Sequence, residues 1–276
     1  MIDLNKTIFE NSRTVPLVCA HRGSASGNIP CNTLAAFNAA LTQGADMIEL
    51  DVSISADGKY YVFHPGMEKA YLRIRSFLRM LPSKKIEKLR FYNPDDTKTQ
   101  FGVNTLEEAF DFLRGKCYIN VDKFWTDVPG ISRAIRESGV EDQVVVKTGV
   151  SARELEQVRK YAADFMFMPI VRGRDDVTDR LCADGVNCIG AEVLFETAAE
   201  ECCGAEYIEK MHEKGKILFV NAEVYDHNAV ISGGLTDDAS ILYGPEKGWE
   251  KLADMGFDVI QTDWAGLLKN YLTSRC

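Results

Sequence analysis

Strand-like runs alternate with helical patterns along almost the whole chain, and this alternation constrains the fold more than any other feature. The runs typical of strands are residues 15–20, 46–52, 117–122, 143–147, 165–171, 187–193, 217–223 and 258–263. Eight alternations of this kind within 276 residues predict an α/β fold in which a parallel sheet closes into a (β/α)₈ TIM barrel.

The helical patterns between these runs have recognisable ends. Examples are residues 33–44, 105–115 and 151–163. Asn32 and Asn104 precede the first two and are the expected N-caps, and a glycine ends each of those two patterns. An open, doubly wound sheet is the alternative architecture. It is disfavoured because no G-x-G-x-x-G or Walker A loop follows the first strand.

Residues 65–104 interrupt the alternation. This stretch is basic and contains Pro82 and Pro94, so we expect a small insertion after the second strand that forms a lid on its βα loop. Together with this insertion, residues 1–276 are expected to form one domain. A second long connection, residues 224–248, is rich in Gly and Asp.

The formal net charge of the chain is −9, which argues against non-specific binding of nucleic acid and against docking on an anionic membrane. The eight cysteines show no metal-ligand spacing and favour a reducing compartment. The chain start lacks the pattern of a signal peptide, and no apolar stretch approaches the roughly 18 residues of a membrane span. We therefore expect a cytoplasmic protein without stable membrane insertion, in which an anionic substrate meets locally placed positive charge.

Two acidic residues lie inside the apolar strand at residues 46–52. Alternation along a strand places Ile48 and Leu50 against the helices, and Glu49 and Asp51 inside the barrel or at its mouth. Two buried carboxylates this close cannot both remain ionised and unpaired. This strand alone is equally consistent with a hard metal ion and with an ion pair to a neighbouring Lys or Arg.

The third strand favours the metal interpretation. In the sequence Tyr118–Asp122, the same alternation places Asp122 on the inner face at the end of the strand. Three carboxylates then converge, and hard cations such as Mg²⁺ or Ca²⁺ prefer carboxylate oxygens. The sequence thus predicts a divalent metal site formed by Glu49, Asp51 and Asp122.

Two of the four histidines are expected beside these acids. His21 and Arg22 follow the first strand, where Gly23 lets the chain turn. An arginine at the barrel mouth suits phosphate oxygens. His64 ends the extended run that returns after the turn at SADG. Either histidine can act as a general acid or base near neutral pH.

Other polar residues near strand ends have less specific interpretations. Lys147 points inward at the end of the fourth strand, and it is equally expected to neutralise a phosphate or to pair with one of the acids. Lys123 is expected on the opposite face, away from the site. Glu192, Asn221 and Asp263 are expected to form rim ion pairs or, as the alternative, contacts that support the site. The remaining expectations are a solvated helix position for His212, a loop position for His227, and pocket-wall or rim packing for Trp125 and Trp264.

The stretch AHRGSASGNIPCNTLAAFNAALTQGADMIELDVSISADGKYYVFHPG resembles the glycerophosphodiester phosphodiesterase family. GFDVIQTDWAGLLKNYL near the end of the chain resembles it more weakly. The ordered motifs are H-R-G, P-x-N-T, G-A-D, E-x-D-V, D-G and a final His. The resemblance implies a (β/α)₈ barrel with an insertion after the second strand, a divalent metal ion, and cleavage of a phosphodiester to an alcohol and a monoester.

The resemblance also implies roles for residues that strand alternation had already brought together. The family's two catalytic histidines, its phosphate-binding arginine and its metal-binding acids fall on His21 and His64, on Arg22, and on Glu49, Asp51 and Asp122. Three positions depart from the family pattern: Cys31 and Pro65 stand where the family usually has acids, and Phe124 stands where it has a lysine. Lys147 can supply that missing charge, and the departures bear on substrate preference more than on metal binding.

Three functional hypotheses follow from these residues. The leading one is a metal-dependent phosphodiesterase that hydrolyses glycerophosphodiesters to an alcohol and glycerol 3-phosphate, with the two histidines as general acid and base. The second is a lipid phosphodiesterase similar to sphingomyelinase D or lysophospholipase D. The third is a barrel that binds a phosphodiester without turning it over, which the departures at Cys31, Pro65 and Phe124 motivate.

Overall fold

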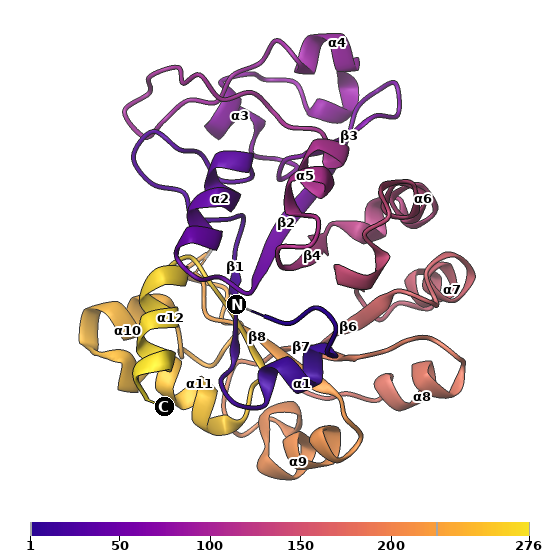
Figure 1. Ribbon diagram of the computed structural model, residues 1–276, viewed down its shortest axis with the longest axis vertical. Coiled ribbons are helices and arrows are strands. Elements are labelled where there is room, and N and C mark those ends of the chain that lie inside the picture. The colour runs from indigo at the N-terminus through magenta and orange to yellow at the C-terminus, as the bar shows by residue number, and fades with distance from the viewer. Residues whose placement is uncertain (1, 225, 276) are drawn as a thin grey trace.

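Eight parallel strands form a closed barrel in the computed structural model, which describes residues 2–224 and 226–275 (Figure 1). The barrel strands are β1 (Leu17–Ala20), β2 (Met47–Ile54), β4 (Tyr118–Asp122), β5 (Val144–Thr148), β6 (Met166–Arg172), β7 (Gly190–Leu194), β8 (Ile217–Asn221) and β9 (Val259–Thr262). Each pairs in parallel with its neighbours, and β1 closes the ring by pairing with both β9 and β2. The predicted (β/α)₈ architecture is confirmed.

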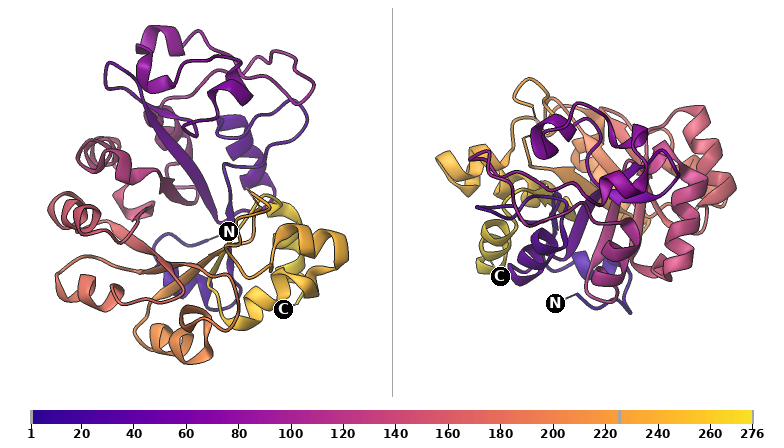
Figure 2. Two further views of the ribbon diagram at one scale, coloured as in Figure 1. Left: turned by 180° about the vertical axis from the view of Figure 1, so that it is seen from behind. Right: turned by 90° about the horizontal axis from the view of Figure 1, so that it is seen from above.

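Helices surround these strands on the outside (Figures 1 and 2). They are α2 (Leu34–Thr42), α5 (Leu106–Leu113), α6 (Val128–Ser138), α7 (Ala152–Tyr161), α8 (Thr178–Ala183), α9 (Ala205–Glu213), α10 (Asp237–Tyr243), α11 (Trp249–Met255) and α12 (Ala265–Ser274). Short 3₁₀ turns are η2 (Phe124–Thr126), η3 (Glu141–Gln143), η4 (Glu201–Cys203) and η5 (Pro245–Lys247). None of the helices in the described ranges is long and apolar enough to cross a membrane.

The apolar core has two layers because strand side chains alternate. Ile48 and Leu50 of β2 belong to the large cluster between strands and helices, as predicted. A smaller cluster fills the barrel from the first residues of several strands, such as Met47 and Tyr118. The N-terminal helix α1 (Ile8–Ser12) contributes Ile8 to this inner cluster. Since apolar side chains fill this end of the barrel, the polar inner residues gather at the other end.

The second barrel strand extends into a hairpin and a long connection. The end of β2 pairs antiparallel with β3 (Tyr60–Val62), as Val52 opposite Val62 shows. The connection to α5 then contains α3 (Glu68–Leu72), η1 (Leu78–Met80) and α4 (Ser83–Ile86). This part lies outside the ring of helices (Figure 1). The predicted insertion after the second strand is therefore confirmed.

The expected N-caps of two helices were wrong by one residue. Thr33 caps α2 by accepting from the backbone N–H of Ala36, and Thr105 caps α5. Asn32 instead has φ 56° and turns its side chain away from the helix, toward the inner face of β2. The displaced asparagine thereby becomes part of the site described next.

Candidate active site

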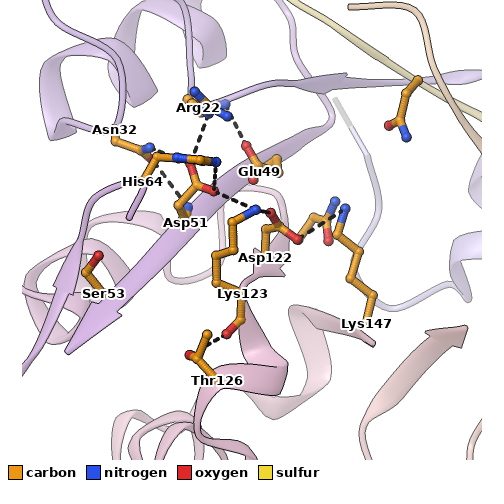
Figure 3. A network of polar contacts seen from close by, with 12 residues as sticks. Arg22, Asn32, Glu49, Asp51, Ser53, His64, Asp122, Lys123, Thr126 and Lys147 are labelled. Carbon is orange, nitrogen blue, oxygen red and sulfur yellow. Dashed lines mark hydrogen bonds and ion pairs between the residues drawn. The ribbon is translucent and has the colours of Figure 1, made fainter. Parts of the chain in front are cut away.

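Three carboxylates meet at the carboxyl end of the barrel. Glu49 and Asp51 point inward from β2, and Asp122 ends the neighbouring strand, β4. The register places Asp51 directly beside Asp122. One oxygen from each of the three residues lies within 4.8 Å of the others, and Figure 3 shows the three side chains converging. Strand alternation predicted this cluster correctly.

Burial sets the electrostatics of the cluster. Glu49 and Asp51 are almost completely enclosed. Desolvation, reinforced by Asp51, raises the pKa of Glu49 to about 8. Burial opposes ionisation of Asp122, but Lys147 and Lys123 outweigh it and lower the pKa of that carboxyl. The buried Oδ1 of Asp51 accepts no hydrogen bond from the described residues. An all-oxygen cluster with an unused buried oxygen fits a hard divalent cation.

The loop after β1 places a guanidinium against these acids. The backbone N–H of Arg22 donates to Glu49 Oε2 at 2.9 Å. In its side chain, Nε lies 2.9 Å from Asp51 Oδ2. Asn32 donates to the same Asp51 oxygen at 2.8 Å. Gly23 has φ +76°, and a Cβ there would lie 2.7 Å from a backbone carbon of α2. This tight turn holds Arg22 at the site.

The first histidine pairs with an acid from the last strand's end. His21 Nδ1 lies 2.9 Å from Asp263 Oδ1. Although burial disfavours the charged imidazole, Asp263, Glu223 and Glu49 raise the pKa of His21 to about 9. Asp263, expected in a rim ion pair or in a contact that supports the site, is therefore the partner of a predicted catalytic histidine.

The second histidine has a different environment. His64 Nε2 lies 3.9 Å from Asp51 Oδ1, and its buried Nδ1 has no hydrogen-bond partner within the described chain. Burial lowers the pKa of His64, an effect that Asp51 only partly offsets. The prediction that His21 and His64 would both lie near the acids agrees with the observed positions, but their protonation preferences are opposite.

Lys123 corrects an expectation drawn from the sequence. Its ammonium group forms an ion pair with Asp122, lies 3.6 Å from Asp51 Oδ1, and sits 5.2 Å from the centre of the Trp125 ring. The expected outward direction assumed that strand alternation continues through this residue. The strand ends at Asp122, and Lys123 adopts a left-handed conformation with φ 61° that turns its side chain back to the acids. Its position just beyond a strand end was the available signal.

Lys147 lies deeper in the barrel. Its ammonium is 2.6 Å from Glu192 Oε2 and 3.7 Å from Asp122 Oδ1. Asn221 donates to the other oxygen of Glu192 at 2.8 Å. The expected ion-pair setting of Glu192 and Asn221 therefore agrees with their positions. Lys147 connects this buried pair to the acid cluster. Of the two expectations for Lys147, its contacts agree with pairing to an acid.

Two further acids support the His21 side of the site, and sequence reasoning did not single them out. Glu223 is buried just beyond β8 and accepts from Gln261 at 3.0 Å, and burial raises its pKa to about 7. Asp237 of α10 accepts from the N–H of Asp263 at 2.8 Å. Asp237 lies in the long connection after β8, whose Asp-rich composition was its signal. Glu223 ends the predicted strand at residues 217–223 on the same face as Asn221, so strand alternation was its signal.

The three departures occupy distinct places. Cys31 is half-buried beside Arg22 and the hydroxyl of Tyr71 in α3, and desolvation raises the pKa of its thiol to about 11. Phe124 is fully buried in η2, whereas Pro65 is exposed. Because Tyr71 belongs to the insertion and contacts Cys31, the insertion reaches the site through Tyr71.

Trp125, which was expected at a pocket wall or in rim packing, lines a cavity of about 580 Å³ together with Arg153.

The other two histidines lie elsewhere. His212 is not solvated as expected, because it is half-buried with Nε2 2.9 Å from Asp258 Oδ2 and its ring against Phe9. His227 has an 88% exposed side chain next to Asp226.

Comparison with known proteins places the chain in a family. The model of the Glycerophosphoryl diester phosphodiesterase family matches residues 21–265, so the chain belongs to this family. The glycerophosphodiester phosphodiesterase of Caldanaerobacter subterraneus subsp. tengcongensis is 32% identical over 160 residues, which cover 53% of this chain and 63% of that protein. The match thus spans less than two thirds of that curated relative.

Solved structures share the fold at lower identity. A glycerophosphoryl diester phosphodiesterase from Parabacteroides distasonis has a TM-score of 0.75 at 19% identity, covering 95% of this chain and 87% of its own. A phosphodiesterase from Oleispira antarctica, solved with the product sn-glycerol-3-phosphate, has a TM-score of 0.62 at 18% identity, covering 95% of this chain and 98% of its own.

Proposed function

We propose that this protein is a metal-dependent phosphoric diester hydrolase that cleaves glycerophosphodiesters to an alcohol and glycerol 3-phosphate. The observation that carries the proposal is the convergence of three carboxylates, two histidines and Arg22 at one end of the barrel. Family membership supports the reaction class. The product bound to the Oleispira antarctica neighbour supports the glycerol 3-phosphate half of the substrate.

Glu49, Asp51 and Asp122 are the residues that would hold the metal ion, either Mg²⁺ or Ca²⁺. When bound, such an ion supplies positive charge that stabilises the phosphoryl oxygens in the transition state. Arg22 adds a guanidinium to the same place. Lys123 adds an ammonium beside Asp122, which offsets the family lysine missing at Phe124.

The two histidines would divide the proton transfers. Because His21 is paired with Asp263 and favours the charged form, we assign it the role of protonating the leaving oxygen. His64 favours the neutral form and faces Asp51, so we assign it the role of accepting the proton of the nucleophile. Environments that push two pKa values apart in this way are typical of acid and base pairs.

We further infer that the described chain acts as one domain, with residues 65–104 as a lid beside the site. The segment has its own apolar cluster, yet Tyr71 reaches Cys31. Seven cysteines in the described ranges are free, which supports a reducing, cytoplasmic location.

One assay tests the proposed reaction. The protein is incubated with glycerophosphocholine, glycerophosphoinositol or lysophosphatidylcholine, in Mg²⁺, Ca²⁺ or EDTA. We expect release of glycerol 3-phosphate that disappears in EDTA and in His21→Ala. Turnover of lysophosphatidylcholine alone would favour the lipid phosphodiesterase hypothesis, and binding of all diesters without turnover would favour a binding barrel.

A further inference from the structure

Positive charge is concentrated in one part of this acidic protein, residues 67–90, which we name the basic segment. It contains eight Lys and Arg residues against two Glu residues, a net charge of +6. Since the whole chain has a net charge of −9, the remaining residues carry −15. The segment includes α3, η1 and α4 and lies outside the ring of barrel helices (Figure 1).

The charges of the basic segment face solvent largely uncompensated. Six exposed residues of the segment have no acidic group within 4.0 Å anywhere in the described ranges: Lys69, Arg75, Arg79, Lys84, Lys85 and Lys88. Neither of its two glutamates cancels them. Glu68 is buried and accepts from the N–H groups of Gly66 and Leu78. Glu87 pairs with Lys59, outside the segment.

Two large apolar side chains stand among these charges. Phe77 and Met80 flank Leu78 and Arg79 in the sequence and are 45% and 66% exposed. The guanidinium of Arg79 lies 5.2 Å from the centre of the Phe77 ring. Leu78, by contrast, is fully buried in a cluster with Tyr61 and Phe63 of the hairpin region. The segment therefore has a completed core beneath it, and Phe77 and Met80 are left on its outer side.

Exposed apolar residues elsewhere do not share this setting. Leu242 and Tyr243 at the end of α10 are also well exposed, but the exposed acids Asp238 and Glu246 lie close to them in sequence. Among the residues described, the basic segment combines two exposed large apolar side chains with six unpaired cations, whereas Val150, also exposed, has one exposed cation, Arg153, three residues away. A partner for this surface must offer both anionic groups and hydrocarbon.

We propose that the basic segment docks on an anionic phospholipid surface, with Phe77 and Met80 entering the interfacial region and the basic side chains facing lipid phosphates. Basic residues near an anionic leaflet and apolar side chains at the headgroup level are the two contributions that hold peripheral proteins there. Nucleic acid would use the charges but leaves Met80 without a role. Tyr71, on the same segment, contacts Cys31 beside Arg22, so docking would bring the site close to lipid-derived diesters.

Vesicle co-sedimentation of the full chain tests this docking. We expect binding to vesicles of phosphatidylcholine mixed with phosphatidylglycerol, none to phosphatidylcholine alone, and loss of binding as salt shortens the screening length. Each basic residue near the surface should contribute on the order of a fivefold increase in partitioning. Phe77→Ser with Met80→Ser should weaken binding roughly tenfold at unchanged charge.

A matched pair of charge variants decides where binding occurs. Replacing Arg75, Arg79, Lys84 and Lys85 by serine should reduce vesicle binding about a hundredfold or more. Replacing four exposed basic residues of the barrel by serine removes the same charge and should leave binding within about twofold: Lys6, Lys160, Arg180 and Lys251. Equal losses in the two variants, or binding to a DNA oligonucleotide but not to vesicles, would overturn the proposal.

Docking of the basic segment on vesicles does not depend on catalysis. None of the substituted residues lies in the candidate active site, so both variants should hydrolyse a water-soluble diester as the unmodified protein does. Vesicle binding without any turnover would leave the docking surface standing and reject the proposed reaction. Turnover without vesicle binding would support the proposed reaction and reject the docking surface.

Discussion

The barrel mouth and the basic segment hold their cations in opposite ways. At the mouth, Arg22, Lys123 and Lys147 each lie within 4 Å of a carboxylate and are largely enclosed. In the basic segment, six exposed cations have no acidic partner in the part of the chain that the structure describes. Paired, enclosed charges position atoms and respond little to salt, whereas unpaired surface charges act at a distance and are screened. The net charge of −9, which argued against docking on an anionic membrane, is a sum over the whole chain and does not reveal the positive basic segment.

The largest expected effect is at the mouth, from Asp51→Asn. This substitution removes the charge that Arg22, His64 and Lys123 all face. We expect the turnover rate to fall roughly 10³-fold or more, and Mg²⁺ or Ca²⁺ to lose its effect on the melting temperature. Rates and thermal unfolding measure both. Asp95→Asn, at an exposed position, should retain both properties, and unchanged metal stabilisation in Asp51→Asn would refute the metal site.

Within the basic segment, Leu78→Ala should lower the free energy of unfolding by about 2–5 kcal/mol, because Leu78 is fully buried in the apolar cluster of this part of the chain. Met80→Ala, two residues away on the exposed side, should change it by no more than about 0.5 kcal/mol. Denaturant unfolding compares the two. Similar values would mean that the segment has no core of its own.

Lys123→Met tests whether the ammonium near Asp122 contributes to substrate binding. A charge-assisted hydrogen bond to phosphate corresponds to roughly a 10- to 100-fold lower kcat/KM when it is lost. Lys59→Met, which removes a half-exposed lysine paired with Glu87, is the control and should match the unmodified protein. Unchanged kinetics for Lys123→Met would assign Lys123 a purely structural role.

A smaller, pH-dependent effect is expected from Asp263→Asn. The pKa of His21 is raised to about 9, so its pairing stabilises the fold fully below about pH 6.5 and loses this effect as pH rises toward 9. If His21 donates a proton, activity should fall above about pH 9, and Asp263→Asn should move that fall toward pH 6.5. At pH 8 the rate should drop roughly tenfold.

Asp226→Asn is the matched control for this pH shift, because it alters an aspartate beside the exposed His227. Its pH–rate profile should overlay that of the unmodified protein. The difference in stability between Asp263→Asn and the unmodified protein should also be larger at pH 6 than at pH 9.5. A profile unmoved by Asp263→Asn would remove His21 from the proton-donor role.

Local periodicity accounts for what was predicted well. Glu49, Asp51 and Asp122 came out on one face because side chains alternate within a strand, whatever the rest of the chain does. Lys123 came out wrongly because the rule was carried one residue past the strand's end. Asn32 was misassigned in a similar way, since the adjacent Thr33 is also a favoured cap residue and the structure uses it instead. An error of one residue at the end of an element was therefore enough to misplace the predicted side chains of Lys123 and Asn32, both of which belong to the site.

The sequence by itself determined the barrel, its insertion and the inner-facing acids, because spacing of two in strands and the alternation of strands with helices are properties of neighbouring residues. Only the tertiary structure decided the partners of these groups. Asp263 lies 242 residues from His21 and meets it because β9 closes the ring onto β1. It also decided which cations are neutralised. Folding encloses the cations of the mouth among the converging acids and leaves those of the basic segment in solvent.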